Sequence, residues 1–489
     1  MENKIAGQHT SESSQSFYRN IALLLLVNLI IKPVYILGID AQVQNALGEN
    51  VYGLFFTLFT FSMLFQIVLD PGILNYNSQL VSKNTKDISK IFAKIAGSKI
   101  ILILSFLLAV QVGGLLVGFP TSYFPILYGV STILILNSFL IYLRSHFSAL
   151  GHYKYEGLFS GLDKLLMILI IGYFLYVKEH ITLNIFILSQ IVALIISCFI
   201  FLLMLRRFFK MRIQFSFSET KSLIKSTAPY ALVLLLMTLY TRLDGLMLER
   251  LLDDDAYSAG VYATGFRLLD AANMIGILFA MLMLPMFSKL IDKKDELNSL
   301  VSDITKVLFL ICTLITLTSW FYAEPIIDFI YTNSTEMHYD VFKYLMIGFW
   351  AMCISNIYGC LFLAKGQLKA INWLFFGGII INVSLNFLWI PKDLAFGAVK
   401  ATIFTQLFVF VGQFLLATKI FQFKHTIQKS LAYLLVLSAL IAIFYGFERY
   451  ISWHWLIEML FISFLALVLS FLCGFLRFPI EFRKKLKPS

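Results

Sequence analysis

The chain consists of long apolar runs separated by short polar segments. A helix that crosses a hydrocarbon core about 30 Å thick takes about 20 apolar residues, and these runs have that length. Only helices and closed barrels satisfy their backbone groups in lipid, and runs of helix length exclude the barrel. We therefore predict an all-α polytopic membrane protein with about fourteen transmembrane helices. The predicted spans begin near Asn20, Tyr52, Ser98, Phe124, Gly157, Leu183, Pro229, Gly260, Val307, Phe342, Ile371, Phe396, Ser430 and Trp453.

One of these starts is marked by a proline. Pro229 in STAPYALVLLL follows a serine and a threonine. Proline is favoured at the first position of a helix, where its missing N–H is not needed. We expect the seventh span to begin at this residue.

Composition excludes a soluble globular protein, because 59% of the 489 residues are hydrophobic and only 14% are charged. The five cysteines lie within apolar runs, and the sequence has no CxxC motif or Cys/His cluster. We therefore expect no disulfide, no metal site and no cofactor. No Ser/His/Asp triad or phosphate-binding loop is present either, so we expect no catalytic residues.

The polar segments alternate in charge along the chain. Those after every second span hold most of the Lys and Arg, as in SKNTKDISKIFAK and RRFFKMR, and so does the C-terminal RKKLK. The opposite segments have few cations and include the acidic run Asp253 to Asp255. Because cytoplasmic loops carry the excess of Lys and Arg, both termini are predicted to be cytoplasmic. The net charge of +11 is thus explained without nucleic acid as a partner.

The two halves of the sequence resemble each other. ENVYGLFFTLF from Glu49 aligns with AGVYATGFRLL from Ala259, an offset of about 210 residues, and two further pairs of segments align in the same order. We predict an N-terminal lobe of spans one to six (residues 1–211) and a C-terminal lobe of spans seven to twelve (212–425). Residues 426–489 add spans thirteen and fourteen and a basic tail. Two six-helix lobes in parallel repeat around a central cavity are a transporter architecture.

Longer segments carry a family resemblance. NALGENVYGLFFTLFTFSMLFQIVLDPGILNYNSQLVSK, TLYTRLDGLMLERLLDDDAYSAGVYATGFRLLD and INVSLNFLWIPKDLAFGAVKATIFTQLF resemble the polysaccharide-export branch of the multidrug/oligosaccharidyl-lipid/polysaccharide exporter superfamily, the Wzx-type flippases. The resemblance covers nearly the whole chain. It implies a protein of the cell (inner) membrane, not an enzyme, in contact with membrane lipids and with a polymerase and other glycan-assembly proteins. The implied activity is transfer of an undecaprenyl-diphosphate-linked oligosaccharide, a repeat unit of O-antigen, capsule or exopolysaccharide, from the cytoplasmic to the outer leaflet by alternating access.

Three cations stand out because charge within a span is costly and needs a reason. Lys32 lies in the first span, in IIKPVYILGID, Arg242 in the seventh and Arg267 in the eighth. The repeat offset places Lys32 and Arg242 at the same position of the two lobes. We predict that the three converge on the central cavity and bind the substrate's diphosphate. For Lys32 the alternative is a side chain that reaches the outer interface.

Two carboxylates accompany the arginines. Asp244 lies two residues after Arg242, and Asp270 lies three residues after Arg267. They are candidates for binding a coupling proton or sodium ion, or for balancing the charge of the arginines. The spacing of Arg267 and Asp270 also fits a salt bridge on one helical face.

The sequence is also compatible with other functions. A multidrug exporter of the same superfamily would have unpaired carboxylates in its cavity, whereas this chain has more cations there. A peptidoglycan-precursor exporter is a second alternative. A membrane-embedded glycan polymerase or glycosyltransferase belongs to a different class, and it would need a sizeable external loop.

Overall fold

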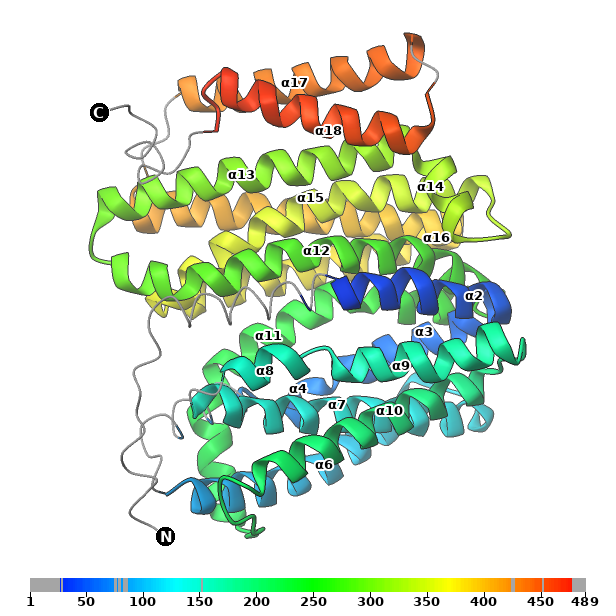
Figure 1. The fold of residues 1–489 in the computed structure, drawn as a ribbon, viewed down its shortest axis with the longest axis vertical. Helices are drawn as coiled ribbons and strands as arrows, with labels where there is room; N and C mark the ends of the chain where they lie inside the picture. The colour runs from blue at the N-terminus through cyan, green and yellow to red at the C-terminus, as the bar shows by residue number, and fades with distance from the viewer. Residues whose placement is uncertain are drawn as a thin grey trace. The chain divides into compact units, whose positions relative to one another are not determined.

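The computed structural model describes residues 27, 30–73, 77, 81, 87–150, 153–423, 427–450 and 453–476. Within these ranges every regular element is helical, which confirms the predicted all-α class. In the first part of the chain the elements are η2 (Ile36–Asp40), α2 (Ala41–Leu47), α3 (Glu49–Leu64), α4 (Gln66–Leu69), α6 (Ile88–Val117), η4 (Thr121–Tyr123), α7 (Phe124–Ala149), α8 (Tyr153–Phe159), α9 (Leu162–Gly172), η5 (Tyr173–Val177) and α10 (Leu183–Leu205). They are followed by α11 (Phe217–Leu251), α12 (Tyr257–Leu290), α13 (Lys294–Phe321), α14 (Ala323–Ile330), α15 (Glu336–Lys365), α16 (Leu368–Phe421), α17 (Ile427–Tyr450) and α18 (Trp455–Leu472) (Figure 1).

Eleven described helices are long and apolar enough to cross a membrane. One of them, α16, holds two of the predicted spans, because the backbone at Leu394 leaves the helical region with φ 55° and ψ −134°. The second predicted span corresponds to the shorter α3 and α4. The predicted start of the first span, Asn20, lies outside the described residues.

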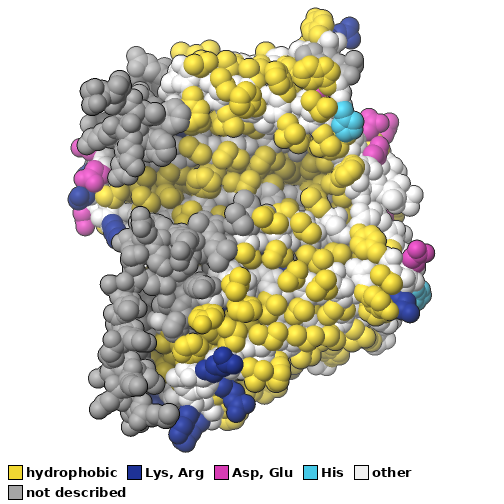
Figure 2. Space-filling model, viewed as in Figure 1, with side chains coloured by type: hydrophobic (Ala, Val, Ile, Leu, Met, Phe, Trp, Pro, Cys, Tyr) yellow, Lys and Arg dark blue, Asp and Glu magenta, His cyan; other side chains and the backbone are white. Residues whose placement is uncertain are grey.

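The surface of these helices is apolar. Leu104 and Leu116 of α6 are 64% and 83% exposed. Figure 2 shows hydrophobic side chains over most of the visible surface of the described helices. Exposed apolar surface on this scale is typical of helices that face lipid.

The seventh span begins next to Pro229, as predicted, because the apolar segment able to cross the membrane is Tyr230–Leu251. Pro229 is not, however, the first residue of the helix. Helix α11 begins twelve residues earlier, at Phe217, and continues through Pro229 to Leu251. Its first turns, FSETKSLIKSTA, are polar, so hydropathy places the start of the apolar run and not the start of the helix. Proline is tolerated within the helix where neighbouring groups satisfy the freed carbonyl.

Contacts divide the chain into two compact units. The first comprises residues up to Leu47 together with Leu58–Leu234, and the second comprises Gly48–Thr57 and Leu235–Ser489. Helices α3 and α11 therefore each contribute to both units. The lobe boundaries at residues 211 and 425 concern sequence similarity and stay a prediction.

In the first unit, α9 contacts α10 and α10 contacts α7, while α9 also contacts η2. The Cβ position of Gly161 lies 2.8 Å from Ile31 Cδ1, so a larger residue there would have to displace the end of the Ile31 side chain. After Pro33 the chain forms the π-helix η2, as expected for a span that a proline distorts. The hydroxyl of Tyr176, in the π-helix η5, donates to the Gly38 carbonyl at 2.7 Å and satisfies a backbone group there.

In the second unit, α15 is the central helix and contacts α12, α13 and α16. The appended pair α17 and α18 packs on α13 through an apolar cluster that includes Leu310, Phe444 and Ile462. The start of α3 crosses the start of α12 in direct backbone contact. The Cβ position of Gly53 lies 2.1 Å from the Ala256 carbonyl oxygen, and that of Gly260 lies 2.2 Å from the Glu49 carbonyl oxygen.

Candidate functional site

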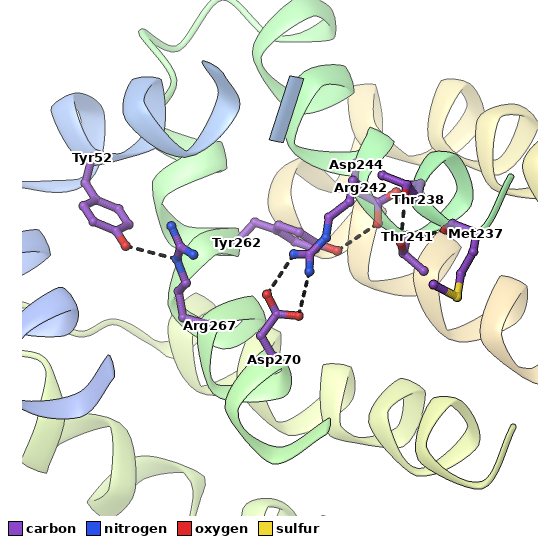
Figure 3. A network of polar contacts seen from close by, with 9 residues as sticks. All are labelled: Tyr52, Met237, Thr238, Thr241, Arg242, Asp244, Tyr262, Arg267 and Asp270. Carbon is purple, nitrogen blue, oxygen red and sulfur yellow. Dashed lines mark hydrogen bonds and ion pairs between the residues drawn. The ribbon is translucent and has the colours of Figure 1, made fainter. Parts of the chain in front are cut away.

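A bidentate ion pair joins α11 to α12. Arg242 donates from Nη1 to Asp270 Oδ2 at 2.8 Å and from Nη2 to Asp270 Oδ1 at 3.1 Å (Figure 3). The guanidinium also lies over the Phe266 ring, 4.9 Å from its centroid. Both oxygens of the Asp270 carboxylate accept from Arg242. Asp270 therefore pairs with Arg242 and not with Arg267, the partner that the sequence spacing favours. Asp270 is thus the ion-pair partner of Arg242, and its role in ion coupling or charge balance stays a prediction.

Arg267 reaches the start of α3. Its Nε donates to the Tyr52 hydroxyl at 3.2 Å, and its guanidinium lies 5.6 Å from the centroid of the Phe56 ring. Tyr52 and Phe56 occupy the same repeat positions as Tyr262 and Phe266 in α12. Phe56 and Phe266 touch edge to face, with centroids 5.8 Å apart. The two predicted arginines thus flank one aromatic pair.

Asp244 of α11 is buried, with 1% of its surface exposed. Its Oδ1 accepts from Asn382 Nδ2 at 2.9 Å and from Asn386 Nδ2 at 2.7 Å. Its Oδ2 accepts from the hydroxyls of Tyr262 at 2.9 Å and Thr402 at 2.6 Å. All four donors are neutral, and within the described part of the chain Asp244 forms no ion pair. The four hydrogen bonds satisfy both oxygens of this buried carboxylate, but no described cation balances its charge.

Tyr262 connects these two groups of residues. Its hydroxyl donates to Asp244, and its ring stacks on Phe266 with centroids 5.4 Å apart and an interplanar angle of 26°. Phe266 is the ring beneath Arg242. Figure 3 shows the Tyr262 hydroxyl directed at Asp244, with the Arg242 side chain passing beside Tyr262 to reach Asp270.

The structure places Lys32 in the first unit, half-buried beside the first turn of α9. The charges that act on it most are Arg144, Asp163 and Lys164. Lys164 in turn lies over the Tyr35 ring at 4.6 Å and 3.9 Å from the Asp163 carboxylate. Four of the five predicted residues therefore share the second unit, and the convergence of Lys32 with the two arginines stays a prediction.

Sequence reasoning missed several polar residues. Asn382, Asn386 and Thr402 complete the surroundings of Asp244, and the only signal was a pair of asparagines four residues apart in an apolar run. It also missed Lys99 of α6, which is 3% exposed and donates to Ser138 Oγ at 2.7 Å. Lys99 lies one residue after Ser98, the predicted start of the third span, where a lysine side chain normally reaches the interface and carries no signal of burial.

The sequence profiles of two protein families match this chain. The profile of a family described as polysaccharide biosynthesis protein matches residues 17–291, more than half of the chain. The MatE profile matches residues 229–388. No curated protein matches the chain.

Solved structures show where else this fold occurs. The chain is similar to a lipid II flippase MurJ in an inward closed conformation, with a TM-score of 0.71 and 14% identity over 95% of this chain and 100% of that one. It is similar to an inward-facing multidrug resistance MATE family transporter, with a TM-score of 0.61 and 14% identity over 82% and 98% of the two chains. A transporter of the same superfamily from Pyrococcus furiosus gives a TM-score of 0.58 and 13% identity over 83% and 95%. At these identities the similarity establishes the fold.

Proposed function

Because this chain belongs to the polysaccharide biosynthesis protein family, within the multidrug/oligosaccharidyl-lipid/polysaccharide exporter superfamily, we propose that it moves an undecaprenyl-diphosphate-linked oligosaccharide to the outer leaflet. The family predicted from the sequence is confirmed, and the chain is a multi-pass membrane transporter and not an enzyme. The substrate is a repeat unit of O-antigen, capsule or exopolysaccharide. The protein resides in the cell (inner) membrane with both termini in the cytoplasm.

The observation that carries this proposal is the pair of arginines on the Phe56–Phe266 rings. Guanidinium groups bind phosphate oxygens in bidentate fashion, and stacking on an aromatic ring fixes their planes. The diphosphate competes with Asp270 for Arg242, so Asp270 keeps Arg242 neutralised when no substrate is bound. Lys32 supplies the third cation from the N-terminal lobe.

The oligosaccharide needs a protein route because its hydroxyls cannot enter hydrocarbon without hydrogen-bond partners. The two lobes open in turn to the cytoplasmic and the outer side while the lipid tail stays in the bilayer. With the cell interior negative, moving one net negative charge outward gains about 2.3 kcal/mol per 100 mV.

Asp244 provides the site for a coupling cation, either a proton or sodium. Its charge is met only by neutral donors among the described residues, and the Asn386 Oδ1 atom nearby has no hydrogen-bond partner there. Carboxylate, amide and hydroxyl oxygens are the ligands that replace the hydration shell of a small cation. Tyr262 transmits occupancy of this site to the aromatic pair beneath the arginines.

Complementation of a flippase-deficient bacterium tests the proposal. Wild type restores surface glycan and clears the lipid-linked intermediate, whereas Lys32→Ala, Arg242→Ala and Arg267→Ala do not, at equal membrane abundance. Lys178→Ala, at the exposed end of η5, is the matched control and keeps full activity. The proposed cation set is wrong if all three variants restore surface glycan fully.

The similarity to a lipid II flippase favours one second candidate, a peptidoglycan-precursor exporter. Complementation of a strain depleted of its peptidoglycan-precursor flippase separates the two. Growth of that strain, without any change of surface glycan in the first, would establish this second function and reject the first. Altered drug resistance without either effect would identify a multidrug exporter.

A further inference from the structure

Helix α16 carries a buried polar stripe that leads away from Asp244. Thr402, Gln406 and Gln413 are spaced four and seven residues apart, which places them on one helical face. The two glutamines are 2% and 3% exposed. All three lie within the second unit.

This stripe faces a row of small residues on α15. The Cβ position of Gly348 lies 3.7 Å from Thr402 Cγ2 and 3.9 Å from Gln406 Cγ, and that of Gly359 lies 3.8 Å from Gln413 Oε1. Ser355 lies between the two glycines, seven and four residues away, on the same helical face. The two helices therefore enclose a narrow polar strip, which we call the lane, made of Thr402, Gln406, Gln413 and Ser355.

The lane has unsatisfied acceptors. Gln406 Oε1, Gln413 Oε1 and Ser355 Oγ are buried, and no donor in the described ranges bonds to them, as for Asn386 Oδ1 beside Asp244. Buried polar atoms in proteins are nearly always bonded, so each exception needs an explanation. Polar side chains that merely hold membrane helices together would bond to each other. A row of free oxygens instead suits a passing cation or a file of water molecules.

The lane runs toward the predicted cytoplasmic end of the unit. From Thr402 to Gln413 it extends eleven residues, about 16 Å of helix. Tyr358 and Phe414, the neighbours of Gly359 and Gln413, line a cavity of about 420 Å³. Most of the residues that line this cavity are apolar, but they include Asn298, Ser302 and Thr305 of α13, the helix that begins at Lys294.

We infer that the lane carries the coupling cation between Asp244 and the cytoplasm through the interior of the second unit. The inference rests on the proposed role of Asp244 and adds a route. Ion and lipid-linked substrate then use separate paths, and the ion can leave while the substrate site faces the other side.

Exchange kinetics test the lane. Purified full-length protein is loaded with radioactive sodium, and its binding constant and exchange rate are measured separately. Gln406→Leu and Gln413→Leu slow exchange by about tenfold or more and leave the equilibrium binding constant unchanged, because they raise a barrier without altering the site. Gln413→Glu keeps an acceptor oxygen and exchanges fast, which shows that the effect is not one of folding.

Thr405→Val is the matched control, since Thr405 is equally buried on α16 but bonds to its own helix at the Ala401 carbonyl and faces Gly378. Normal exchange in both leucine variants, with sodium binding abolished by Asp244→Asn, would reject the lane and leave the coupling role intact. If wild type does not bind sodium, the same comparison is made for proton uptake after a pH jump. Binding of neither ion at Asp244 would reject the coupling role and the lane together.

Discussion

Phe56 and Phe266 occupy equivalent positions in the two sequence repeats, and their rings touch edge to face with centroids 5.8 Å apart. Each ring lies beneath one arginine, Arg267 on Phe56 and Arg242 on Phe266. Two arginines therefore lie on one aromatic pair, and only the aromatic residues of this arrangement are related by the repeat. Substitutions of the two phenylalanines should therefore affect transport, as substitutions of the arginines should.

Removing the ring beneath Arg267 should weaken transport without unfolding the protein. In Phe56→Leu the guanidinium loses a cation–π contact of about 0.5–2 kcal/mol. We expect surface-glycan export to fall several-fold while the melting temperature shifts little. Phe55→Leu, on a buried neighbour of the same helix, is the control for lost aromatic packing. An equal loss of export in both variants would mean that packing alone explains the effect.

Charge reversal separates the structural from the transport role of the Arg242–Asp270 pair. Asp270→Ala leaves Arg242 half-buried and unpaired, so we expect a loss of about 2 kcal/mol in stability, below the range for fully buried pairs because both groups are partly exposed. Arg242→Asp combined with Asp270→Arg should restore most of that stability, since the pair re-forms. Export should stay low because the cation then lies on α12 and not on α11. Thermal melting and complementation measure the two effects, and full export by the double variant would contradict the role of Arg242.

Neutralising Asp244 should abolish ion dependence with little loss of fold. Asp244→Asn keeps the shape of the side chain and removes the charge that the site holds. We expect export to become independent of the sodium or proton gradient, measured in proteoliposomes with each gradient imposed in turn. Asp253→Asn, in the acidic segment before α12, is the control. Unchanged gradient dependence in Asp244→Asn would place the coupling site elsewhere.

The crossing of α3 and α12 should not tolerate a side chain. In Gly260→Ala the new methyl group would lie 2.2 Å from the Glu49 carbonyl oxygen, so the backbones must separate. Overpacking of this kind costs about 1–3 kcal/mol. Gly446→Ala in α17, whose added methyl group meets nothing within 4 Å, should stabilise its helix by about 0.5–1 kcal/mol. Melting temperatures of the two variants should move in opposite directions, and a stable Gly260→Ala protein would refute the tight crossing.

The class of the fold and most of the charged residues of the site could be predicted because lipid makes both conspicuous. Arg242, Asp244, Arg267 and Asp270 stand out against an apolar run, and all four lie in one unit. Their pairing could not be predicted. Local spacing favours Arg267 with Asp270, whereas Asp270 bonds to Arg242, 28 residues away on the neighbouring helix.

The neutral residues around Asp244 could not be predicted for a different reason. Residues with amide or hydroxyl side chains, such as Asn382, Asn386 and Thr402, cost less free energy in a membrane helix than charged residues do. They therefore occur throughout membrane helices, and their presence alone does not indicate a site. They acquire meaning only when the two parts of α16, on either side of Leu394, place them around Asp244 of α11. The start of α11 was missed for a related reason, because hydropathy does not detect a helix that begins outside the apolar run.

Tyr262 links Asp244 to the aromatic ring beneath Arg242. Its hydroxyl bonds to Asp244 and its ring supports the Phe266 ring under Arg242, so it cannot serve one partner without affecting the other. By thermodynamic linkage, whatever factor a cation at Asp244 applies to the affinity of the arginines for an anion, the anion applies to the affinity of Asp244 for the cation. If Asp244 binds the proposed cation and the arginines bind the proposed diphosphate, Tyr262 couples the two affinities, and Tyr262→Phe should let them vary independently.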